Sequence, residues 1–161
     1  MQRLPLPEYV IALGDTEQAA GMAAAARRDY LLVGAETRLL QANGVNTDAE
    51  LAIFEADHGD ASQAVELGAR AWAAAPSVRS ADAYSWALSA AGRDADALRM
   101  SSKAMRLGSR DPSFLYHAGM VALRAGRTVR AEAFLTRLVQ GSPRFNPIYG
   151  PRAQRALESI R

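Results

Sequence analysis

The chain alternates between long segments of helix-favouring residues and short segments that contain glycine, proline or asparagine. Alanine alone accounts for 34 of the 161 residues, and alanine is the strongest helix former. The short segments therefore divide the chain into predicted helices. Their ranges are 7–20, 22–42, 48–58, 61–74, 80–91, 94–107, 112–125, 128–140 and 151–160. Asn43-Gly44 ends the long second helix, Thr47 is the expected cap of the third, and the fold class is all-α.

Four of the predicted turns carry a glycine that is followed, after the same short interval, by an alanine. The pairs are Gly21 and Ala26, Gly59 and Ala64, Gly92 and Ala97, and Gly126 and Ala131, so the turn glycines recur at nearly constant intervals. A helical hairpin needs a glycine where the backbone reverses, and a small residue where its second helix packs closest to its first. The pattern therefore indicates a helical hairpin that is repeated four times.

This pattern resembles the tetratricopeptide repeat (TPR), a helical hairpin with a period of about 34 residues. The matching positions are Leu13-Gly14 and Tyr30 in the first repeat; Leu51-Ala52, Ala71 and Pro76 in the second; Tyr84-Ser85 and Ala104 in the third; and Ala118-Gly119, Leu135, Leu138 and Pro143 in the fourth. The first-helix aromatic of the family is replaced by Glu17, Glu55, Leu88 and Ala122, and the closing proline of the third repeat by Ser109.

The resemblance implies a right-handed superhelical solenoid of about four TPR hairpins in a single domain, residues 1–161. The repeats would span 7–43, 45–77, 78–111 and 112–145, with a capping helix at 151–160. No cap is predicted before the first repeat, although a terminal repeat normally needs a polar outer face. The chain resembles the C-terminal part of a longer bacterial TPR protein, and we expect it to be such a part. No signal peptide or membrane span is predicted in it, and its cellular compartment is left open.

The residue patterns of enzyme chemistry do not occur in the sequence. Without cysteine, neither a disulfide nor a thiolate metal site can form. His58 and His117 lie far apart in the chain, lack metal-ligand spacing, and are expected to be ordinary surface or groove residues. No nucleophile elbow, phosphate-binding loop or dinucleotide fingerprint is present. We expect no catalytic residue, metal or cofactor, and therefore a protein that is not an enzyme.

In TPR proteins the first helix of each repeat lines a concave groove, and the resemblance implies which residues face it. The predicted partner-binding residues are Ile53, Asp57, Arg79, Asp82, Trp86, Ser89, Tyr116, Met120 and Arg124. The apolar and aromatic residues of this set lie in the middle of the predicted groove, and the charged residues lie beside them. This arrangement suits an extended peptide or a helix. The alternative is that Trp86 packs against adjacent helices. The groove lacks the lysine and asparagine set with which some TPR proteins hold a chaperone's terminal carboxylate.

Charge is unevenly distributed along the chain. Residues 1–98 carry 7 basic and 14 acidic groups, whereas residues 99–161 carry 12 basic and 3 acidic groups. Nucleic-acid or other polyanion binding through Arg99, Arg106, Arg110, Arg127, Arg130, Arg137 and Arg144 is a second hypothesis, although aromatic residues for base stacking are not interleaved with them. Self-association of acidic with basic halves is a third. The leading interpretation is a non-catalytic scaffold that binds a protein or peptide of unspecified identity.

Overall fold

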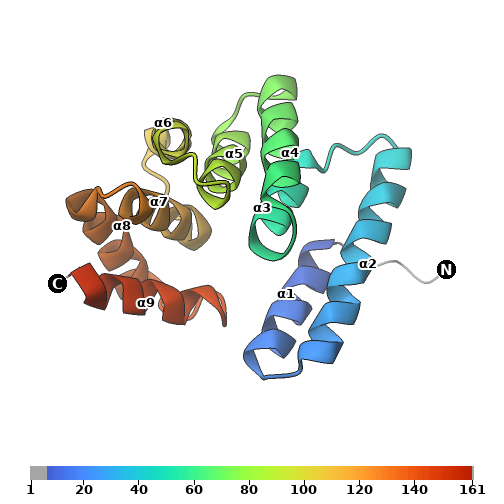
Figure 1. The fold of residues 1–161 in the computed structure, drawn as a ribbon, viewed down its shortest axis with the longest axis horizontal. Helices are drawn as coiled ribbons and strands as arrows, with labels where there is room; N and C mark the ends of the chain where they lie inside the picture. The colour runs from blue at the N-terminus through green and yellow to red at the C-terminus, as the bar shows by residue number, and fades with distance from the viewer. Residues whose placement is uncertain (1–6, 161) are drawn as a thin grey trace. The chain divides into compact units, whose positions relative to one another are not determined.

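The computed structural model describes residues 7–160, which form helices joined by turns (Figure 1). The helices are α1 (Pro7–Ala19), α2 (Ala23–Ala42), α3 (Asp48–His58), α4 (Ala61–Ala74), α5 (Val78–Ala90), α6 (Asp94–Ala104), the short 3-10 helix η1 (Met105–Leu107), α7 (Pro112–Arg124), α8 (Thr128–Gly141) and α9 (Tyr149–Ile160). No strand occurs within residues 7–160, which confirms the all-α prediction. Residues 1–6 and 161 of the predicted domain lie outside the described part.

Helix ends follow the predicted turn chemistry at most positions. Gly92 and Gly126 have φ angles of +72° and +70°, and the backbone amide of each following residue closes the turn on the helix before it. Gly59 differs, because its φ is not positive, and Asp60 caps α4 by accepting a hydrogen bond from the backbone N–H of Gln63 at 2.8 Å. The cap predicted at Thr47 is wrong, since its buried Oγ1 has no hydrogen-bond partner among residues 7–160.

Small residues set the spacing of the helices within each hairpin. The alanines of the repeated pattern, Ala26, Ala64, Ala97 and Ala131, are all buried, with 3% exposure or less. A Cβ built on Gly14 would lie 2.5 Å from Cε1 of Tyr30, and one on Gly119 would lie 2.7 Å from Cδ2 of Leu135. The two partners are separated along the chain by the same interval in both pairs, so equivalent positions of two hairpins make the same close contact.

The chain divides into two compact units. Unit 1 holds Asn146–Ile148 and the described residues up to Thr47, and consists mainly of the α1–α2 hairpin. Unit 2 runs from Asp48 to Phe145 and continues from Tyr149 through α9. In unit 2, α3, α5 and α7 each contact both the helix that follows and the next odd-numbered helix. No helix of the described residues is both long and apolar enough to cross a membrane, as predicted.

Candidate partner-binding site

The nine residues predicted to face a partner all lie in unit 2, on three successive odd-numbered helices. They are Ile53 and Asp57 on α3; Arg79, Asp82, Trp86 and Ser89 on α5; and Tyr116, Met120 and Arg124 on α7. Because α5 contacts both α3 and α7, the structure places these residues on adjoining helices.

Burial divides the nine residues into two groups. Asp82, Trp86, Ser89 and Tyr116 are buried, whereas Ile53, Asp57 and Met120 are half-buried and Arg79 and Arg124 are exposed. Only the second group is accessible to another molecule. The first group packs the helices against one another and fixes where the second group lies.

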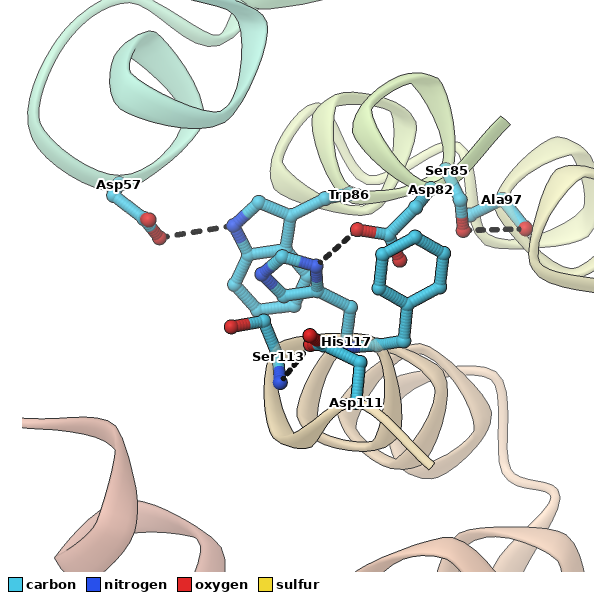
Figure 2. A network of polar contacts seen from close by, with 9 residues as sticks. Asp57, Asp82, Ser85, Trp86, Ala97, Asp111, Ser113 and His117 are labelled. Atoms are coloured by element: carbon cyan, nitrogen blue, oxygen red, sulfur yellow. Dashed lines mark hydrogen bonds and ion pairs between the residues drawn. The ribbon is translucent and has the colours of Figure 1, made fainter. Parts of the chain in front are cut away.

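The indole of Trp86 is held on two sides by other helices of unit 2. Its Nε1–H donates a hydrogen bond to Oδ1 of Asp57 on α3 at 2.9 Å. Its ring stacks on the imidazole of His117 from α7, with centroids 4.5 Å apart and planes 20° apart (Figure 2). Only 4% of Trp86 is exposed. This burial agrees with the alternative interpretation, in which Trp86 packs against adjacent helices.

His117 and Asp82 form a buried pair between α7 and α5. The distance from Nδ1 of His117 to Oδ2 of Asp82 is 2.8 Å, and the two side chains are only 5% and 6% exposed (Figure 2). Burial alone would lower the pKa of His117. The charge and hydrogen bond of Asp82, with the charges of Asp57 and Asp111, outweigh it, so the pKa of His117 is raised above 6.5. These acidic groups therefore stabilise the imidazolium form of His117 relative to a free imidazole.

The expectation that His117 is an ordinary surface or groove residue is therefore wrong. A signal for its place was available, because the interval from Asp82 to His117 is close to the predicted repeat period. Residues separated by one period occupy nearly equivalent places on successive first helices. Periodicity could therefore bring the two side chains near each other, but it does not specify that their polar atoms meet.

Tyr116 is the centre of an aromatic cluster that joins α5, α7 and α9. Its ring centroid lies 5.6 Å from that of Trp86, 6.0 Å from that of Phe145 and 5.0 Å from that of Tyr149. Aromatic rings in edge-to-face or offset contact at these separations attract one another, so each pair is stabilised by more than the burial of its surface. Phe145 and Tyr149 lie at and beyond the end of the fourth predicted repeat, and sequence reasoning did not assign either of them to the site.

The two exposed arginines are held in different ways. Arg79 forms an ion pair with Glu50 of α3. Arg124 lies over the ring of Trp86, with Cζ 5.2 Å from the centroid, and its Nη1 donates a hydrogen bond to Oγ of Ser89 at 3.2 Å. The guanidinium of Arg124 therefore rests on a buried ring while its remaining N–H groups stay available.

The arginines of the polyanion hypothesis lie on other elements. Arg99 pairs with Asp96 at 2.5 Å, and Arg130 donates to Oγ of Ser102 at 3.1 Å. Arg106, Arg110, Arg127, Arg137 and Arg144 are exposed. Within residues 7–160 no three histidine, aspartate or glutamate side chains gather as metal ligands. No protein-family model, curated protein or solved structure matches the chain.

Proposed function

We propose that the chain is a TPR-type interaction module that holds an extended peptide or a helix of a partner protein against α3, α5 and α7. The observation that carries the proposal is the repeated packing order in unit 2, where successive odd-numbered helices adjoin one another. Such an arrangement gives a continuous surface to which each hairpin contributes one helix. We further propose that the chain is a solenoid of about four such hairpins, closed by α9.

The accessible residues of this surface suit a peptide. Ile53 and Met120 offer half-buried apolar side chains, and Asp57, Arg79 and Arg124 offer charges beside them. Apolar anchors supply most of the affinity in such grooves, while charges at the margin select the partner and its orientation. The buried contacts of Trp86 keep this surface in one arrangement before the partner arrives, which lowers the entropic cost of binding.

Selection from a randomised peptide library, followed by affinity measurement on the selected peptides, tests the proposal. We expect Ile53→Glu and Met120→Glu each to weaken binding by about 1–2 kcal/mol, because a charge would replace an apolar contact. Val129→Glu is the matched control, since Val129 lies on α8 and is 82% exposed. If peptides bind and only the control variant weakens them, the proposed surface is wrong.

Salt separates this function from the two charge-led hypotheses. Ions at physiological strength screen exposed charges over roughly 8 Å, whereas apolar contacts persist. Peptide binding that survives moderate salt therefore favours the proposed function. Binding to a nucleic acid that falls steeply with salt, and falls further in an Arg127→Gln/Arg137→Gln variant, would favour the polyanion hypothesis.

A further inference from the structure

Two arginines from different helices flank the aromatic cluster around Tyr116. Arg124 of α7 lies over the ring of Trp86 at 5.2 Å, and Arg152 of α9 lies over the ring of Tyr149 at 5.7 Å. Both rings pack directly on Tyr116, which is 2% exposed. The two guanidinium groups therefore approach one buried phenol from two helices, and both side chains are exposed.

Charges near the phenol support this placement. Burial raises the pKa of Tyr116 and Asp57 raises it further, whereas Arg152 and Arg124 oppose the rise. Both cations therefore act on the same hydroxyl group.

Neither arginine forms an ion pair with an acidic side chain within residues 7–160: Arg124 bonds Ser89, and Arg152 lies over the ring of Tyr149 and hydrogen-bonds the hydroxyl of Tyr116. Asp57 is the acid that faces this cluster from α3, and its Oδ1 accepts the hydrogen bond from Trp86. The sequence from 99 to 161 carries 12 basic and 3 acidic groups, so other carboxylates are scarce on these helices. The cations are thus positioned on rings without an acid of their own.

We propose that Arg124 and Arg152 bind carboxylate side chains of the partner, so that the segment crossing α7 and α9 is an acidic peptide. A guanidinium positioned over a ring presents its remaining N–H groups as a planar fork, which matches a carboxylate. Two arginines supported by two separate rings suit two carboxylates in one segment better than a single chain terminus. The inference rests on the proposed function and extends its surface to α9, outside the nine predicted residues.

Three pools of otherwise randomised peptides test this inference by fluorescence anisotropy. The first contains a fixed Glu-x-Glu and an amidated C-terminus, the second a fixed Gln-x-Gln and an amidated C-terminus, and the third Gln-x-Gln with a free C-terminal carboxylate. We expect the first pool to bind about five- to tenfold more tightly than the second, an advantage that salt reduces. The third pool should match the second. Tighter binding by the third pool alone would overturn the inference, because the carboxylate that the protein recognises would then be the chain terminus and not a side chain.

Matched double variants show whether these two arginines cause the preference for Glu-x-Glu over Gln-x-Gln peptides. Arg124→Gln/Arg152→Gln should remove most of it, whereas Arg137→Gln/Arg155→Gln has the same net charge and should retain it. Arg152→Gln alone should remove part of it, and this variant leaves the contact of Arg124 with Trp86 in place. A preference that survives in both Arg152 variants overturns the inference.

Two outcomes separate this inference from the proposed function. If both amidated pools bind equally and Met120→Glu weakens both, the proposed surface stands and the acidic preference is wrong. If no pool binds the folded protein, the proposed function fails, and the inference that rests on it fails as well.

Discussion

Single side chains of α5 show how this protein satisfies polar atoms inside a helical core. Asp82 meets His117, Trp86 meets Asp57, and Oγ of Ser85 donates to the backbone carbonyl of Ala97 at 2.9 Å (Figure 2). A buried polar group without a partner costs about 1–3 kcal/mol, so such networks specify one packing arrangement when every member is bonded. Asp82 and Trp86 were predicted to face a partner, but in this structure they fix the register between neighbouring helices.

The pair formed by His117 and Asp82 makes the stability of unit 2 depend on pH. Because the pKa of His117 is raised in the folded protein, its stabilising contribution is complete below the unfolded value near 6.5. It is lost as pH rises through the folded value. We therefore expect the unfolding free energy contributed by His117 to decrease above about pH 6.5.

Chemical denaturation of the wild type and His117→Gln across this pH range measures the effect. Glutamine has no titrating group but keeps a donor that can reach Asp82. The stability difference between the two proteins should shrink as pH rises. A matched control is His58→Gln, because His58 lies on α3 outside this pair. A difference that is constant with pH would show that folding does not raise the pKa of His117.

At the scale of helices, the sequence predicted the all-α class and most helix ends, because each hairpin carries its own signals. Gly92 and Gly126 adopt the backbone conformation that a turn glycine provides, and the patterned alanines are buried. It could not predict which polar atoms of α3, α5 and α7 meet, because that depends on rotamers and on the spacing between helices. The cap at Thr47 failed for a similar reason, since residue type alone does not determine where a hydroxyl points.

Overpacking a patterned alanine tests the hairpin geometry. Ala131 is fully buried on α8, so Ala131→Leu should destabilise the protein by about 1–3 kcal/mol by forcing α8 away from its neighbours. Ala133→Leu introduces the same side chain slightly later on α8, where the position is exposed, and should change stability by less than about 0.5 kcal/mol. Thermal unfolding of both variants gives the comparison. Equal midpoints would contradict the assignment of Ala131 to the helix contact.

At the scale of the whole molecule, the two units differ in how well they bury their residues. Nine of the thirteen residues of α5 are buried, compared with three of the thirteen residues of α1. Unit 1 also exposes several large apolar side chains to the extent of 47–72%: Tyr9, Leu13, Met22, Leu31, Leu32, Leu39 and Val45. The sequence predicted an uncapped first hairpin, but its pattern did not reveal a separate compact unit.

Buried oxygens that have no hydrogen-bond partner in the described part of the chain weaken unit 1 further. They are Oε2 of Glu17, Oδ2 of Asp29, Oε2 of Glu36 and Oγ1 of Thr47. Burial raises the pKa of Glu36, which is the expected response of a carboxyl that has lost water. Each such atom gives up bonds to water that the fold does not replace. Unit 1 therefore has less apolar burial and more unsatisfied polar groups than α5 and α7.

Native-state hydrogen exchange should therefore reveal two levels of stability. Amides of α1 and α2 should exchange through an opening of lower free energy than amides of α5, α6 and α7, because local opening is easiest where burial is least. Glu36→Leu should slow exchange in α1 and α2 without slowing it in α5, since leucine removes a buried carboxyl oxygen that has no partner. Leu39→Gln is the control, because Leu39 is 48% exposed on the same helix. Uniform protection from α1 to α8, with no local response to Glu36→Leu, would show that the two units open together as a single cooperative structure.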